Sequence, residues 1–161
     1  MSIEGRLAEP SAAAKPHASA AMQILGYGAL VPLVAMAMII FFTYPAPGSE
    51  GVLRAEVAYG AALLSFLGGI RWGIAVSAGG QQLLFRPLAI ATLPIPFAWI
   101  VLFMDVRMAI AALMVGFLLL LFAERLDDES PTPGWYRALQ LPFTIMVELG
   151  LGVSLVATLI G

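Results

Sequence analysis

Long apolar stretches, separated by short polar or proline-rich segments, dominate the pattern of hydrophobic and polar positions along the chain. A helix needs about 20 apolar residues to cross a hydrocarbon core of about 30 Å. The pattern therefore predicts an all-α fold, an integral membrane bundle of five transmembrane helices. We expect the five spans at residues 22–42, 52–77, 83–104, 108–123 and 139–160.

Prolines interrupt several of these stretches, and each removes a backbone donor from the helix that contains it. Pro32 lies in the middle of the first span and predicts a kink. Pro94 and Pro96 lie near the middle of the third, which we expect to bend or unwind there. Pro142 interrupts the fifth. The segment Asp105–Arg107 is so short that the third and fourth spans should form an antiparallel hairpin.

The chain divides into two parts by composition. Residues 1–20 are rich in Ala, Ser, Glu and Pro and predict a mobile N-terminal tail, whereas residues 21–161 form the five-helix domain. The basic residues on the side of the N-terminus are Arg6, Lys15, Arg86, Arg125 and Arg137, against Arg54 and Arg107 on the other side. This excess places the N-terminus in the cytoplasm and the C-terminus outside.

The amino-acid composition excludes several classes of binding site and catalytic site. Only 11% of the 161 residues are charged, against about 25% in soluble domains. The net charge of −2 gives no basic surface for nucleic acid. The absence of cysteine excludes thiolate catalysis and cysteine-bound metals, and a single histidine, His17, excludes histidine triads and metal sites. We therefore expect no cofactor and no metal, and an enzymatic function is disfavoured.

Small residues mark the second span as the centre of the bundle. Ala61, Ser65, Gly69 and Gly73 recur every four residues and contain a Gly-xxx-Gly pattern, which lets helix backbones approach closely. Two more glycines lie on roughly the opposite face. The predicted helix-packing residues are Gly60, Ala61, Ser65, Gly68, Gly69 and Gly73. Tight packing explains this pattern, and close approach to a ligand is the alternative.

Two ionisable residues interrupt apolar spans and form the candidate intramembrane polar site, Arg71 and Glu148. The predicted spans bring both towards the cytoplasmic side, so the arginine is able to reach the carboxylate. One interpretation is a buried ion pair, or a neutral Glu148 with a hydrogen-bonded neighbour, that fixes helix register. The other is a polar point on a substrate or proton path, because ionisable groups inside membranes are commonly functional. Contact with a partner subunit is the third.

The remaining charged residues are expected outside the hydrocarbon. Arg54 and Glu56, like Asp105 and Arg107, are interpreted as solvated charges at helix ends. Residues 124–134 are expected to form a polar loop. Three consecutive acids in it, residues 127–129, offer oxygen ligands to a divalent cation, although a solvated acidic loop explains them better.

The second span also carries a family resemblance. The run Ser65–Gly73 (SFLGGIRWG), preceded by Tyr59–Ala61 (YGA), resembles the signature of the transmembrane protein 69-like family, a membrane domain of unknown function. Supporting marks are Gly26–Pro32 (GYGALVP), the prolines of the third span and Pro133–Leu139 (PGWYRAL). The resemblance implies an integral membrane protein, with eukaryotic relatives in mitochondria and bacterial ones in the inner membrane. It implies no activity, substrate or catalytic residue. For this chain a bacterial inner (cytoplasmic) membrane location is expected.

Together these observations favour a non-enzymatic function as a structural, assembly or accessory subunit of an inner-membrane complex. The expected partners are the lipid bilayer and a larger membrane complex or a second copy of the chain, and not nucleic acid. The alternative is a small transporter or channel-like protein that uses Arg71, Glu148 and the broken third helix. An intramembrane enzyme ranks third.

Overall fold

The computed structural model describes residues 20–78, 85–126 and 132–161, and within these ranges the regular structure is entirely α-helical. The helices are α1 (Ala20–Gly28), α2 (Val31–Thr43), α3 (Ser49–Ser77), α4 (Phe85–Thr92), α5 (Pro94–Val101), α6 (Val106–Arg125) and α7 (Gly134–Ile160). The prediction of an all-α membrane bundle is confirmed.

Four helical segments are long and apolar enough to cross a membrane. They are Ala20–Thr43, which joins α1 and α2, and the single helices α3, α6 and α7. The remaining apolar segment, Phe85–Val101, is shorter and consists of α4 and α5. At 1.5 Å per residue it covers about 25 Å, less than a hydrocarbon core of about 30 Å. The number of five full spans is therefore approximate.

Proline explains two of the helix breaks. The first span is interrupted at Ala29 and Leu30, just before Pro32, and the third is interrupted at Leu93, just before Pro94. Both breaks were predicted. Pro142 behaves differently, because α7 continues through it, so the predicted interruption of the last span is wrong.

The predicted hairpin between the third and fourth spans is present. Asp105 caps α6, where its Oδ1 accepts a hydrogen bond from the backbone N–H of Arg107 at 3.0 Å. This capping satisfies one of the backbone donors that a helix start leaves without a partner. The chain reverses within residues 102–105, and α5 packs against α6.

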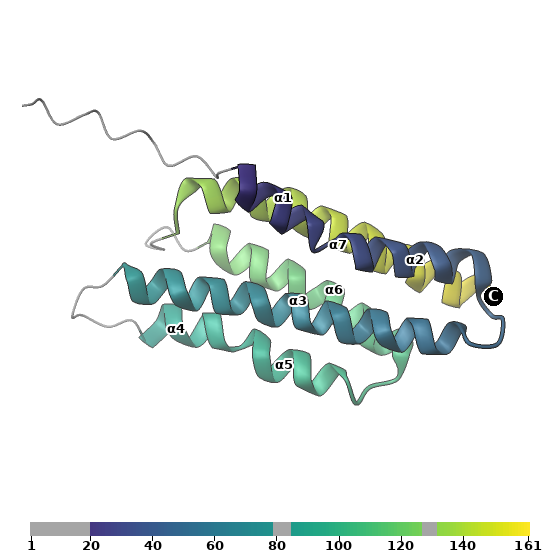
Figure 1. Ribbon diagram of the computed structural model, residues 1–161. Coiled ribbons are helices and arrows are strands. Elements are labelled where there is room, and N and C mark those ends of the chain that lie inside the picture. Colours follow the sequence, from purple (N-terminus) through teal and green to yellow (C-terminus); the bar gives the residue numbers. More distant parts are fainter. Residues whose placement is uncertain (1–19, 79–84, 127–131) are drawn as a thin grey trace, which may run out of the picture.

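α3 is the central helix. It packs against α2, α4, α5 and α6, whereas α7 packs against α1, α2 and α6. Figure 1 shows α3 between the α4–α5 pair on one side and the α1, α2 and α7 helices on the other. The centre of the core is formed by Leu33, Leu64, Leu113, Phe117 and Leu151, all nearly inaccessible to solvent.

The bundle has two ends, the α1 end and the C-terminal end. The α1 end contains the start of α1, the last turns of α3 and α6 and the first turn of α7. The C-terminal end contains the α2–α3 turn, the start of α6 and Gly161 (Figure 1). The predicted tail, apart from Ala20, lies outside the described residues, and so do the acids at 127–129.

Candidate functional site

Two glycines of α3 lie at close helix contacts. A β-carbon on Gly68 would come within 2.7 Å of the backbone carbonyl of Ala91 and 3.1 Å of Pro94. A β-carbon on Gly60 would lie 3.0 Å from a methyl group of Leu113. Glycine at these positions therefore permits α3 to approach the α4–α5 break and α6.

The other predicted stripe of α3 behaves differently. Ala61 is buried, and Ser65 is half-buried and donates a hydrogen bond to the Ala61 carbonyl at 2.9 Å. Gly69 and Gly73 are exposed, and β-carbons there would meet nothing within 4 Å. The expected packing inside the bundle is not found at Gly69 and Gly73, which leave a small-residue face of α3 uncovered.

Arg71 is buried in α3, with 5% of its surface exposed. Its Nη1 donates a hydrogen bond to the backbone carbonyl of Leu120 in α6 at 3.3 Å. Its charge acts on Glu124, one turn further along α6. Arg71 therefore connects α3 with α6 near the α1 end.

Glu124 and Arg71 form a group of buried charges that we call the Arg71–Glu124 cluster. Glu124 was not identified as a buried residue from the sequence. It was assigned to a polar loop, but α6 extends to Arg125 and Glu124 is only 1% exposed. Arg71 has the largest electrostatic effect on it, followed by Arg137 and Arg125. The burial of Glu124 could have been predicted from its spacing, because Glu124 continues the buried helical series Leu113, Phe117 and Leu120.

Glu148 lies apart from Arg71. It is half-buried in α7, and no charged side chain of the described residues acts on its carboxyl group. Glu148 is 14 residues from the start of α7, or about 21 Å, whereas Arg71 is six residues from the end of α3, or about 9 Å. The structure does not bring the two predicted residues together.

Glu56 is a second buried acid that sequence reasoning misplaced. It was interpreted as a solvated charge beside Arg54, but only Arg54 is exposed, whereas Glu56 is 0% exposed. Its Oε1 accepts a hydrogen bond from Ser154 Oγ of α7 at 2.9 Å, and its Oε2 has no hydrogen-bond partner. The signal was its spacing, because Leu53, Glu56 and Gly60 lie on one buried face of α3.

A series of polar side chains follows one face of α7. Tyr136, Gln140, Thr144 and Glu148 are four residues apart, and each has a polar atom without a hydrogen-bond partner in the structure. The first three are more than nine-tenths buried. We call these four residues the α7 series. It extends about 18 Å along the helix, from the α1 end to the middle of the membrane.

The surroundings of the α7 series contain space. Tyr136 and Gln140 line a cavity of about 330 Å³ between α1, α3 and α7, whose other walls include Phe66 and Phe143. Tyr136 also interacts electrostatically with Glu124 and Arg71. The series therefore starts beside the Arg71–Glu124 cluster. Among the residues that the structure covers, no group of three or more His, Asp or Glu side chains is suited to bind a metal.

Comparison with known proteins identifies a family and relatives that are named as transmembrane proteins. A family model described as "Protein of unknown function (DUF3429)" matches residues 18–160. Transmembrane protein 69 of Xenopus tropicalis is 33% identical over 140 residues, which cover 82% of this chain and 52% of that protein. Transmembrane protein 69 of Mus musculus is 33% identical over 107 residues, or 63% of this chain and 42% of that protein.

The chain thus spans about half the length of the curated relatives it matches. No solved structure matches it. The resemblance to the transmembrane protein 69-like family is confirmed, and with it the assignment to integral membrane proteins. The descriptions of this family and of these relatives assign no activity.

Proposed function

The chain belongs to the DUF3429 family of proteins of unknown function, and on that premise we propose that it is a small transporter or channel-like protein that conducts protons. The observation that carries this proposal is the α7 series, Tyr136, Gln140, Thr144 and Glu148, with its unsatisfied polar atoms. This reverses the order of the two functions favoured by sequence alone. The change follows from Arg71, which acts electrostatically on Glu124, whereas no charged side chain of the described residues acts on Glu148.

Unpaired polar groups inside a membrane call for an explanation. Each costs free energy unless water or a ligand satisfies it, and buried water in proteins typically makes about three hydrogen bonds to such groups. Donors and acceptors on successive turns of one helix offer such bonds along a line. A file of water beside α7 would satisfy Tyr136, Gln140 and Thr144 together and carry protons to Glu148.

Glu148 has the chemistry of a proton acceptor at the inner end of this file. An ionised carboxylate without a counter-charge is unfavourable in hydrocarbon, so Glu148 holds a proton in the closed state. It exchanges that proton with the water file. Glu56 and Ser154 form a second polar site about 9 Å further along α7, and apolar Leu151 lies between them. Conduction therefore requires opening at Leu151.

Cysteine accessibility tests the water file, and the chain has no cysteine of its own. Gln140→Cys and Thr144→Cys are expected to react with a small cationic thiosulfonate reagent in proteoliposomes. Leu141→Cys and Ile145→Cys are the matched controls, because both side chains are exposed on the lipid-facing surface of the same helix turns. Equal reaction at all four positions, or none at 140 and 144, would contradict the file.

Proton flux tests the function itself. The purified protein is placed in liposomes with an internal pH dye, and a potassium diffusion potential drives protons inward. The wild type should acidify the interior and Glu148→Gln should reduce the rate to that of empty liposomes. Leu149→Ala, a change on the exposed face, should conduct normally. Flux that is unchanged in Glu148→Gln would refute the proposal.

The accessory function is the second candidate, and a separate observation favours it. Beyond Gly69 and Gly73, the uncovered face of α3 includes Phe66, Trp72 and Val76, all exposed large side chains. Small and aromatic residues on one lipid-facing surface suit close packing with a helix of another protein. In this reading the family member is a structural, assembly or accessory subunit of an inner-membrane complex.

Co-purification in mild detergent tests that reading. A stoichiometric larger partner that is lost on Gly69→Leu or Gly73→Leu, and retained on Val115→Leu in α6, would support it. A protein that purifies alone or with copies of itself would contradict it. The orientation is part of both proposals: the N-terminus cytoplasmic and the C-terminus outside, in a bacterial inner membrane, with residues 21–161 as one domain behind the tail of residues 1–20.

A further inference from the structure

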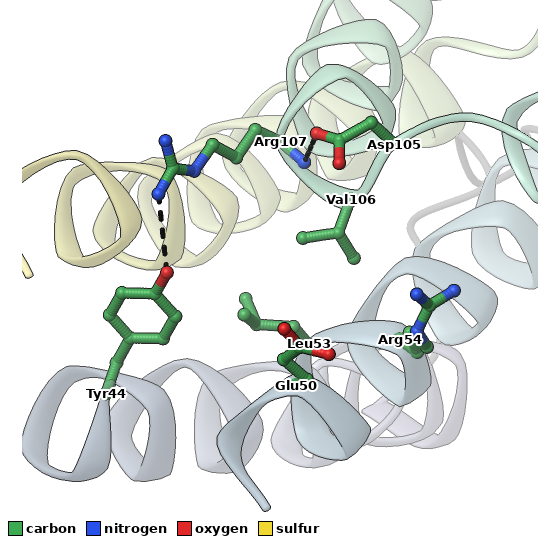
Figure 2. Close-up of a pocket in the computed structure, with 7 residues that line it drawn as sticks. All are labelled: Tyr44, Glu50, Leu53, Arg54, Asp105, Val106 and Arg107. Atoms are coloured by element: carbon green, nitrogen blue, oxygen red, sulfur yellow. Dashed lines mark hydrogen bonds between the residues drawn. The ribbon is translucent and has the colours of Figure 1, made fainter. Parts of the chain in front are cut away.

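A polar cavity of about 270 Å³ lies at the C-terminal end of the bundle. Its lining residues come from the α2–α3 turn, the first turns of α3 and the start of α6: Tyr44, Glu50, Leu53, Arg54, Asp105, Val106 and Arg107. Figure 2 shows Arg107 extended towards Tyr44 on one side of this space and Arg54 on the other side, with Leu53 and Val106 between them. From the sequence, Arg54, Asp105 and Arg107 were interpreted as solvated charges at helix ends. Glu50 was not considered.

All four charged side chains of this cavity are exposed, and two of them form hydrogen bonds in the structure. Arg107 Nη2 donates a hydrogen bond to Tyr44 Oη at 3.4 Å, and Asp105 uses one carboxylate oxygen to cap α6. Within the described part of the chain, neither Arg54 nor Glu50 forms a hydrogen bond or ion pair through its side chain, and no ion pair joins any of the four. Two guanidinium groups and two carboxylates therefore surround one space without neutralising each other directly.

We propose that this cavity binds the phosphoethanolamine head group of a membrane lipid. The guanidinium group of Arg54 or of Arg107 takes the phosphate, because guanidinium matches phosphate oxygens with paired N–H donors. The carboxylates of Glu50 and Asp105 take the ammonium group. A zwitterionic head group carries one charge of each sign, so it can interact with the arginines through its phosphate and with the acids through its ammonium group.

The position of the cavity in the bundle indicates that the bound phosphoethanolamine group belongs to a membrane lipid. The cavity lies where α2 ends and α3 and α6 begin, at the ends of membrane-crossing segments, which is the level of lipid head groups. Its apolar walls are Leu53 and Val106. Phe103 and Met104, which directly precede Asp105, are exposed apolar side chains that offer a surface to acyl chains. The site is independent of the proton path, which begins at the opposite end.

The same chemistry predicts which lipids are rejected. A choline head group carries three methyl groups in place of the N–H donors, so it gives Glu50 and Asp105 no hydrogen bond. A glycerol head group brings no cation, so it leaves two carboxylates beside a phosphate. We therefore expect phosphatidylethanolamine to be retained in preference to phosphatidylcholine and phosphatidylglycerol.

Native mass spectrometry tests the site with the full chain. The protein is reconstituted in nanodiscs that contain equal amounts of phosphatidylethanolamine, phosphatidylcholine and phosphatidylglycerol, released in the gas phase, and its retained lipids are counted. The wild type should keep phosphatidylethanolamine. The double change Arg54→Gln with Arg107→Gln should reduce that retention about tenfold or more, because charge-assisted hydrogen bonds are lost. Arg86→Gln at the α1 end is the control and should change nothing.

A second variant separates the two halves of the site. Glu50→Gln with Asp105→Asn should shift preference from phosphatidylethanolamine towards phosphatidylglycerol, and asparagine still caps α6. Thermal unfolding must match the wild type for each variant, so that loss of folding is excluded. Retention that is equal for all three lipids, or unchanged in the arginine variant, would overturn the proposal. Saturable binding of soluble phosphoethanolamine without lipid retention would refute the lipid as source.

Discussion

At the scale of single residues, the carboxyl group of Glu56 depends on one hydroxyl group. Ser154 Oγ donates to Glu56 Oε1 at 2.9 Å, and both residues are completely buried. Removing the donor in Ser154→Ala leaves a buried carboxyl group without a partner. We expect a loss of about 1–3 kcal/mol of unfolding free energy, observed as a lower melting temperature in detergent.

Two control variants make this prediction specific. Glu56→Gln keeps an oxygen acceptor for Ser154 and should melt close to the wild type. Val156→Ala, at an exposed position of the same helix, should also have a small effect. A normal melting temperature for Ser154→Ala would mean that Glu56 finds another donor.

Gly68 and Gly69 are neighbours in α3, and alanine substitutions at the two positions are expected to have opposite effects on stability. Gly68→Ala forces a β-carbon to within 2.7 Å of the Ala91 backbone carbonyl, which cannot move away as a flexible side chain would. This change should destabilise the protein by about 1–3 kcal/mol, the usual range for overpacking. Gly69→Ala meets nothing within 4 Å and should stabilise α3 by up to about 1 kcal/mol, because alanine favours the helix. Equal melting temperatures for the two variants would contradict the contact geometry.

At the scale of elements, the Arg71–Glu124 cluster joins α3 to α6. Arg71→Gln leaves the buried Glu124 without its main counter-charge, and Glu124→Gln leaves the buried arginine without its own. Removing either charge leaves the other buried and less well compensated, which destabilises the fold. Each single variant should therefore melt well below the wild type, and the double variant should recover part of the loss, because no unpaired charge remains.

The same measurement distinguishes Glu124 from Glu148 as the partner of Arg71. The effects of Arg71→Gln and Glu148→Gln should add without recovery, because about 12 Å of depth separates the two residues along the bundle. Recovery in the variant that combines 71 and 148, and not in the one that combines 71 and 124, would overturn the structural assignment.

At the scale of the whole molecule, the short α4–α5 segment decides the topology. If Phe85–Val101 crosses the membrane despite its break, the chain crosses five times and its two ends lie on opposite sides. We expect a reporter joined after Gly161 to be active only in the extracytoplasmic compartment. A reporter joined after Ala78 should be active only in the cytoplasm. Activity of both reporters on the same side would show that α4 and α5 do not cross.

Much of the element pattern could be predicted from sequence, because it depends on local properties. Apolar runs of sufficient length form helices in a membrane, where the backbone has no other way to satisfy its hydrogen bonds. The breaks before Pro32 and Pro94 follow from a missing donor. Pro142 was misjudged because α7 tolerates it within a packed bundle, which proline alone does not reveal.

Residue pairings were less predictable, because they depend on helix rotation. A step of two residues along a helix carries a side chain to roughly the opposite face, as exposed Arg54 and buried Glu56 show. Both Glu56 and Glu124 lie on buried faces at positions near helix ends. The pairing of Arg71 with Glu148 rested on depth alone. It failed because Glu124 lies nearer to the arginine on a helix that packs against α3.

By itself the sequence determined that this chain is a helical membrane protein, that its helices break near Pro32 and Pro94, and that α3 is small enough to pack at the centre. Hydrophobic length and proline chemistry are sufficient for those conclusions. Only the tertiary structure decided which charges meet. It brought Glu124 under the electrostatic influence of Arg71 and joined Glu56 to Ser154 by a hydrogen bond. Among the described residues it left one polar atom of each member of the α7 series without a hydrogen-bond partner. Such contacts depend on how whole helices rotate and pack, a property that no single stretch of sequence contains.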